Sequence, residues 1–196
     1  MKTSKTALVL TSMLLAATLQ ASAGVVYTQV NISIPLNSYY NVDLNGDGFL
    51  DFSLRSAFLQ AYCESGDDYV WFLDVNPGSN AAVIAAITPG LAVALALPAG
   101  VVVGPGNSFY SGTATMAELF WGACTSGSEG MWLNVPDRYL GLRFSDSQKG
   151  AHYGWAKIST AAYVDDSGHL HVSTFLSGFA YEAIAGQPIL TGQISD

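Results

Sequence analysis

Acidic and amide side chains recur at alternate positions in the run DLNGDGFLDF, which begins at Asp43. Counted from Asp43 as one, positions three and five are Asn45 and Asp47, position six is glycine and position nine is Asp51. A hard cation such as Ca²⁺ takes about six to eight oxygen ligands, and a glycine at position six permits the sharp turn that gathers them. The backbone carbonyl at position seven, that of Phe49, adds another ligand. The spacing therefore predicts a structural Ca²⁺ site formed by Asp43, Asn45, Asp47, Phe49 and Asp51.

The loop departs from an EF-hand, because position twelve is Leu54 instead of a bidentate glutamate and the flanking segments are not helical. It resembles the shorter D-x-[DN]-x-D-G-x-x-D calcium loops of integrin-type propeller repeats, in which the ninth residue closes the shell. A hairpin turn without an ion is the alternative, since Asn-Gly and Asp-Gly are strong turn signals. Mutual repulsion among three carboxylates favours the ion. Mg²⁺ fits less well, because it keeps more of its water.

The first 23 residues are typical of a secretory signal peptide. Lys2 and Lys5 supply a positive start, an apolar stretch follows, and Ala21-Ser22-Ala23 offers a cleavage site. The apolar stretch is shorter than the roughly 20 residues that span a bilayer. We therefore expect a signal peptide over 1–23, a single domain over 24–196 with no membrane span, and a secreted or periplasmic protein.

The charge balance excludes one large class of partner. Removal of the two leader lysines lowers the net charge from −8 to −10. Nucleic-acid binding needs lysine and arginine to neutralise phosphates, so it is not expected here. Two cysteines remain, Cys63 and Cys124, and an oxidising compartment predicts a disulfide between them. Two buried free thiols are the alternative, whereas a zinc site is disfavoured by the absence of a C-x-x-C motif.

Other residues whose side chains could bind a metal or take part in catalysis occur in less specific patterns. His169 and His171 share one face of a predicted strand and could bind Zn²⁺ or Cu²⁺, but solvent-facing histidines fit better. Nothing resembles a serine or cysteine nucleophile motif. Glu118, Glu129 and Glu182 are not paired by their spacing as a glycosidase requires. Aromatic core packing is favoured over sugar stacking for the four tryptophans, Trp71, Trp121, Trp132 and Trp155.

Period-2 alternation dominates the chain and predicts short strands. These cover 24–36, 38–43, 49–54, 68–75, 91–97, 139–144, 153–164, 169–175 and 178–183. A short helix or turn is expected over 81–87, and one or two helical turns over 113–121, where Met116, Leu119 and Phe120 have helical spacing. In the segment HYGWAKIST (152–160), Tyr153 and Trp155 face one way and Ala156 and Ile158 the other. The fold predicted is all-β: a single-domain antiparallel β-sandwich with one or two short helices, or a jelly roll.

Four segments in the second half carry a family resemblance: LPAGVVVGPGNSF (97–109), RYLGLRF (138–144), HYGWAKIST (152–160) and SGFAYEAIAGQPILTG (177–192). Together they resemble exported bacterial β-proteins of unassigned role, many of which carry a PEP-CTERM sorting signal. The resemblance implies export from a Gram-negative bacterium and an exopolysaccharide or another cell-surface component as partner. It implies no catalytic residues. Asp196 ends the sequence without a Pro-Glu-Pro motif, so release or periplasmic retention is expected.

Three functions follow from these features. The first is a secreted, calcium-stabilised, non-enzymatic β-sandwich with a surface or matrix role. The second is a glycan-binding module, which should show exposed coplanar aromatic rings beside a groove near the ion. The third is a polysaccharide or peptide hydrolase, which should show an acid pair in a pocket.

Overall fold

The structure is a computed structural model that describes residues 24–146, 148, 150–164, 166 and 170–196. The described residues form strands and no helix, in line with the predicted all-β class. In chain order the strands are β1 (Val25–Ile34), β2 (Ser38–Val42), β3 (Phe52–Cys63), β4 (Gly66–Pro77), β5 (Ala81–Thr88), β6 (Leu91–Ala94), β7 (Val102–Val103), β8 (Phe109–Tyr110), β9 (Ala114–Gly122), β10 (Ser126–Gly130), β11 (Arg138–Ser145), β12 (Ala151–Val164), β13 (Leu170–Glu182) and β14 (Ile189–Leu190).

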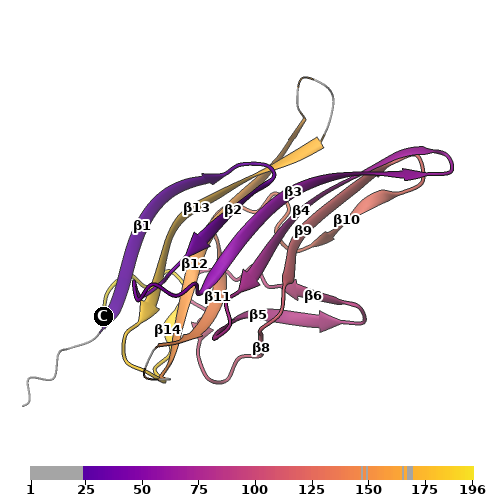
Figure 1. Cartoon of the computed structure of the whole chain (residues 1–196). Helices are drawn as coiled ribbons and strands as arrows, with labels where there is room; N and C mark the ends of the chain where they lie inside the picture. Colours follow the sequence, from indigo (N-terminus) through magenta and orange to yellow (C-terminus); the bar gives the residue numbers. More distant parts are fainter. Residues whose placement is uncertain (1–23, 147, 149, 165, 167–169) are drawn as a thin grey trace, which may run out of the picture.

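One continuous sheet folds over to make the two layers of the sandwich (Figure 1). Its main order is β1-β13-β12-β11-β5-β6-β9-β4-β3-β2, with β8 paired to β5 and β10 paired to β9. Strand β5 joins the layers, because its first half pairs with β11 and its second half with β6. Among the strands that the structure describes, every pairing is antiparallel except the parallel bridge between β6 and β9.

Both helix predictions are wrong. The segment 81–87 lies in β5, whose first five residues are all buried, so the covered strand shows none of the alternation that marks a half-exposed one. The segment 113–121 lies in β9. Its pairing with β4 shifts register, since Leu73 pairs with Ala117 but Asp74 pairs with Thr115. This register shift is a β-bulge in which Met116 is the extra, unpaired residue. The extra residue interrupts the strand's period-2 alternation, so Met116, Leu119 and Phe120 have the spacing of a helix.

The core occupies both faces of β12. Ala156 and Ile158 are buried in the large cluster between the two layers. Tyr153 and Trp155 point to the opposite face, where a smaller cluster forms with Val103 and Ile189 of the β7–β14 ribbon. The opposed faces predicted for this strand are therefore confirmed, and each one buries large apolar side chains.

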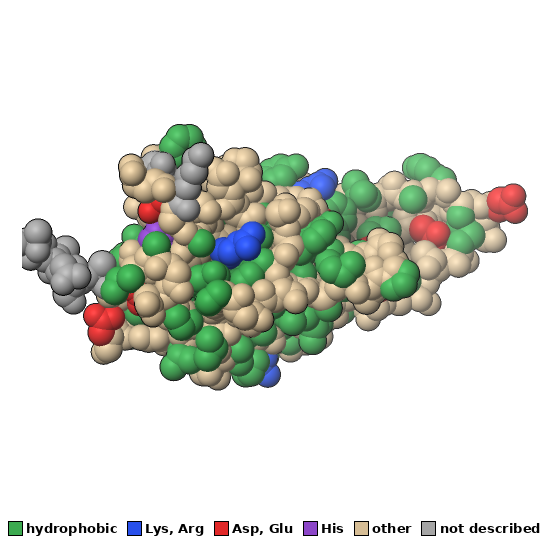
Figure 2. Space-filling model, turned by 90° about the horizontal axis from the view of Figure 1, so that it is seen from below, with side chains coloured by type: hydrophobic (Ala, Val, Ile, Leu, Met, Phe, Trp, Pro, Cys, Tyr) green, Lys and Arg blue, Asp and Glu red, His purple; other side chains and the backbone are tan. Residues whose placement is uncertain are grey.

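The hairpins β3–β4 and β9–β10 extend beyond the other layer as a long arm (Figure 1). This arm forms the tapering end of the molecule in Figure 2. A disulfide joins Cys63 to Cys124 near its tip, with the two Cα atoms 6.4 Å apart, so the predicted pairing is confirmed. Asp68 supports the bridge, because its Oδ1 accepts a hydrogen bond from the N–H of Cys124 at 3.0 Å. In the described part of the chain no helix is long and apolar enough to cross a bilayer.

Candidate functional site: the Asp-rich loop and its cleft

Three connections meet at one end of the sandwich: the Asp-rich loop (43–51), the turn from β4 to β5 (78–80) and the residue that follows β11, Asp146. Strand pairing brings them together, because the start of β3 lies beside the end of β4 and the end of β11 lies beside the start of β5. Backbone hydrogen bonds then join them. The N–H of Gly78 donates to the carbonyl of Asp51 at 2.8 Å, and the N–H of Ser145 donates to that of Asn80 at 3.1 Å.

The Asp-rich loop curls around the Asp43 carboxylate. Its Oδ1 accepts from the N–H groups of Gly46 at 2.8 Å and Asp47 at 3.2 Å, and its Oδ2 accepts from Gly48 at 2.8 Å. The next two acceptors repeat the pattern: Asn45 Oδ1 bonds the N–H of Asp47, and Asp47 Oδ1 bonds that of Phe49. Both glycines have left-handed backbones, with φ of 72° and 85°, which a glycine adopts without strain.

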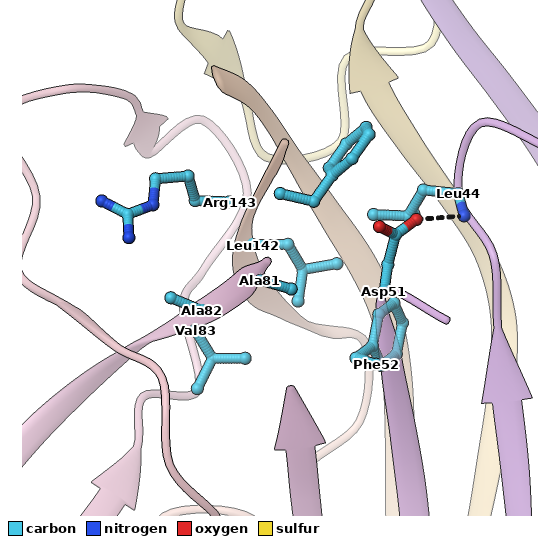
Figure 3. Close-up of a pocket in the computed structure, with 9 residues that line it drawn as sticks. Leu44, Asp51, Phe52, Ala81, Ala82, Val83, Leu142 and Arg143 are labelled. Atoms are coloured by element: carbon cyan, nitrogen blue, oxygen red, sulfur yellow. Dashed lines mark hydrogen bonds between the residues drawn. The ribbon is translucent and has the colours of Figure 1, made fainter. Parts of the chain in front are cut away.

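Asp51 is the most buried acid of the loop, with 7% of its surface exposed. Its Oδ2 accepts from the Leu44 N–H at 2.7 Å, whereas its Oδ1 accepts no hydrogen bond from the described chain (Figure 3). Burial raises the pKa of this carboxyl group from 3.8 to about 6, and the nearby carboxylates of Asp43 and Asp47 add to the rise. The enclosed space beside Asp51 in Figure 3 is too small to admit water.

The three loop carboxylates do not all converge. Two oxygens that bind one Ca²⁺ at about 2.4 Å lie at most about 4.8 Å apart. Among the described residues, the group of three potential ligands that meets this limit is Cys63, Asp68 and Cys124. Its sulfurs form the disulfide and are not thiolate ligands. Binding of an ion at the Asp-rich loop would therefore draw its acidic side chains closer together.

A cleft of about 500 Å³ opens where the three connections meet. Phe49 and Leu50 line it on the side of the Asp-rich loop, together with Asp47 and Asp51. Ser79 and Asn80 of the β4–β5 turn line it as well, and Ser145 and Asp146 complete it from the end of β11. Volumes of roughly 300–1,000 Å³ are typical of small-molecule sites.

Asp146 is held firmly in place. Its Oδ1 accepts from the N–H groups of Gln148 at 2.9 Å and Gly150 at 2.8 Å, and its Oδ2 lies 3.0 Å from His152 Nε2. The hydrogen bond with His152, followed by that with Gly150, lowers the pKa of Asp146. The other ring nitrogen of His152 lies 2.9 Å from the carbonyl of Glu182, so both nitrogens donate when the ring is protonated.

The cleft thus places Asp51, whose pKa is raised, in the same cavity as Asp146, whose pKa is lowered. Carboxyl pairs that act as general acid and base in enzymes also have pKa values shifted apart. Hydrolysis would also need both groups to reach a substrate. Both oxygens of Asp146 are already committed to the protein, which gives that residue a structural role. Of the glutamates considered from the sequence, Glu118 and Glu129 are cross-strand neighbours on the arm and Glu182 is buried.

The aromatic residues mostly pack as predicted. Trp71, Trp132 and Trp155 are at most 1% exposed. Trp121 is half-buried on the arm and stacks on Tyr69 at 5.9 Å. The prediction of solvent-facing histidines is wrong for His171, which is buried with its ring 5.5 Å from that of Tyr163. His169 lies outside the described residues.

Sequence reasoning identified the Asp-rich loop but missed the rest of the cleft. Ser79, Asn80, Ser145 and Asp146 belong to no recognisable motif, and the strand pairing alone places them beside Asp51. No protein-family model, curated protein or solved structure matches the chain.

Proposed function

We propose that this chain is an exported β-sandwich that binds Ca²⁺ in its Asp-rich loop and has a structural, non-enzymatic role at the cell surface or in an extracellular matrix. One feature of the loop supports calcium most directly: the second carboxylate oxygen of buried Asp51 has no partner in the described chain. Asp51 lines the cleft, so a cation bound there could take this free oxygen as a ligand.

The donor set fits a hard cation. Every candidate ligand is an oxygen, from Asp43, Asn45, Asp47, Asp51 and the Phe49 carbonyl. Asp43 already holds the loop curled through three N–H groups, so the backbone is bent before any ion binds. An ion would neutralise the repulsion that Asp43 and Asp47 exert on Asp51, and it would stabilise the β2–β3 hairpin that the loop connects.

Export is supported by the leader-like N-terminus and by the disulfide, because such bonds persist in oxidising compartments. The non-enzymatic role is supported by the committed oxygens of Asp146. A cell-surface component or exopolysaccharide as partner rests on the family resemblance of the second half of the chain.

The test is thermal unfolding of residues 24–196 in 10 mM CaCl₂ and in chelator. A dissociation constant near 10⁻⁴ M, ordinary for extracellular sites, would stabilise the folded state by about 2.7 kcal/mol at that concentration. For a chain of this size the midpoint should rise by about 5–10 °C. The response should be lost in Asp51→Asn and Asp47→Asn and retained in Glu64→Gln, which removes one exposed charge from the arm. Equal midpoints with and without Ca²⁺ would refute the proposal.

A further inference from the structure

We propose that the open edge of β3 at the tip of the arm pairs with the same edge of a second copy of this chain. The two strands run antiparallel, with Ala61 of one copy opposite Ala61 of the other. The inference goes beyond the calcium site and does not depend on it, because the Asp-rich loop precedes β3 whereas the pairing edge lies at the strand's far end.

The second half of β3 has a neighbouring strand on one side only. Strand β2 pairs with β3 from Phe52 to Ser56, whereas β4 pairs with it as far as Cys63. Among the described strands none lies beside residues 59–63 on the side where β2 has ended. Residues 59–62 are also exposed on both faces. The arm that projects in Figure 1 therefore has an open sheet edge near its tip.

One hydrogen bond shows which backbone groups point out of this edge. The N–H of Phe58 donates to Asn37 Oδ1 at 2.8 Å, and Asn37 precedes β2, so this N–H faces the side of β2. Backbone groups alternate between the two sides of an antiparallel strand. The N–H and carbonyl groups of Gln60 and Tyr62 therefore face the same open side, where the described chain offers them no partner.

This edge lacks the features that usually prevent strand addition. Lysine, proline and bulges protect open edges in natural proteins. Residues 57–63 read AFLQAYC, without a charge or a proline, and their register with β4 is unbroken. Leu59 is 52% exposed and Tyr62 is 80% exposed. The other edge of the arm, β10, reads SGSEG, whose glycines and charged Glu129 disfavour a further strand.

A second copy of the edge is complementary to the first when the pair is centred on Ala61. Gln60 of each copy then lies opposite Tyr62 of the other, and each of these pairs exchanges both of its hydrogen bonds. The two Tyr62 rings become diagonal neighbours on one face, which is within reach for aromatic side chains. This register leaves the hydrogen bond between Phe58 and Asn37 in place. The contact is isologous, so it closes at a dimer.

Charge also favours contact at this edge. Two copies that each carry a net charge of −10 repel one another, so they can approach closely only through an uncharged surface. Antiparallel arms that overlap over residues 59–63 place the two sandwich bodies at opposite ends, far beyond the Debye length of about 8 Å. The short overlap buries less than the roughly 1,200 Å² of a standard interface, so we expect a dissociation constant of roughly 10⁻⁵–10⁻³ M.

The experiment is sedimentation equilibrium of residues 24–196 in chelator, over a protein concentration range that spans the expected dissociation constant, up to about 1 mM. The mean mass should rise from that of the monomer toward that of a dimer. Ala61→Lys and Ala61→Glu each place like charges directly opposite one another, so each variant alone should associate about fivefold more weakly. Their equimolar mixture should recover at least the wild-type affinity, because opposite charges then face each other. Ser128→Lys, on the edge formed by β10, should associate like the wild type.

Each other outcome overturns the proposal. A wild type that stays monomeric at the highest concentration excludes a second copy as the partner of this edge. Weakened variants whose mixture does not recover exclude the register centred on Ala61. Growth beyond a dimer, or weaker association of Ser128→Lys, means that β10 takes part and that the contact does not close. Because chelator is present throughout, none of these results bears on the calcium proposal.

Discussion

Asp74 allows a quantitative test of how burial of a carboxyl group changes the free energy of unfolding. It lies on the outer face of β4, away from the Asp-rich loop, so the test does not depend on the proposed calcium site. It pairs across the strands with Arg55, whose guanidinium carbon lies 4.7 Å from the centre of the Phe72 ring. Burial raises the pKa of Asp74 from 3.8 to about 6, and the Glu118 carboxylate adds to the rise. Attraction to Arg55 and a hydrogen bond from Thr115 oppose it without cancelling it.

The direction of the pH dependence follows from the difference between the folded and unfolded pKa of Asp74. The folded protein holds the Asp74 proton more tightly than the unfolded chain, so this residue's contribution to stability is full below pH 3.8 and is lost as the pH rises through 6. Ionisation at pH 7.5 then costs the folded state at most about 3 kcal/mol, at about 1.4 kcal/mol per pKa unit. Partial solvent access reduces this value, and we expect Asp74→Asn to stabilise the fold by about 1–2 kcal/mol.

The assay is urea unfolding of the wild type and of Asp74→Asn, in chelator, between pH 3.5 and 8. The advantage of the variant should be near zero at the lowest pH, grow between pH 3.8 and 6, and stay constant above about pH 7. Asp67→Asn, a change of one charge near the tip of the arm, serves as the control. Destabilisation by Asp74→Asn at pH 7.5 would show that the pairing with Arg55 outweighs the cost of burial, and the reasoning would be wrong.

Three further predictions concern stability. Replacing both Cys63 and Cys124 by serine should cost about 4 kcal/mol by the chain-entropy estimate, since the bridge spans 61 positions, and denaturant unfolding measures it. Trp132→Phe should cost about 2–3 kcal/mol in the same assay, because the buried indole loses its 3.0 Å hydrogen bond to a carbonyl at the end of β6 and leaves a void. Gly130→Ala should lower the melting temperature by several degrees, because φ is 87° there and an added Cβ would strike the carbonyl of Met116.

Each of these outcomes has a clear opposite. The disulfide prediction would be contradicted if the double serine variant kept the denaturant midpoint of the wild type. Faster amide exchange confined to β10 would then show that the arm unfolds separately from the rest of the protein. Equal stability of Trp132→Phe would mean that the indole hydrogen bond contributes nothing. A neutral Gly130→Ala would show that the turn after β10 adapts at no cost, whereas Gly106→Ala, which meets no neighbouring atom, provides the tolerated comparison.

The sequence by itself determined the class of fold and the local chemistry, because both depend on residues close together in the chain. Alternation in β1 reports a strand with two unlike faces, and the spacing from Asp43 to Asp51 specifies the curl of one loop. The disulfide followed from the presence of two cysteines and from the expected compartment.

Only the tertiary structure decided which strands lack alternating apolar and polar residues, and which residues surround the Asp-rich loop. The start of β5 is covered on both faces and β9 contains a bulge, so neither has the period of a simple half-exposed strand. The cleft joins connections from separate parts of the chain, and Asn80 and Ser145 meet because β5 and β11 are neighbours. Pairing between distant strands depends on how the whole sheet folds over, and local residue patterns carry little information about that choice.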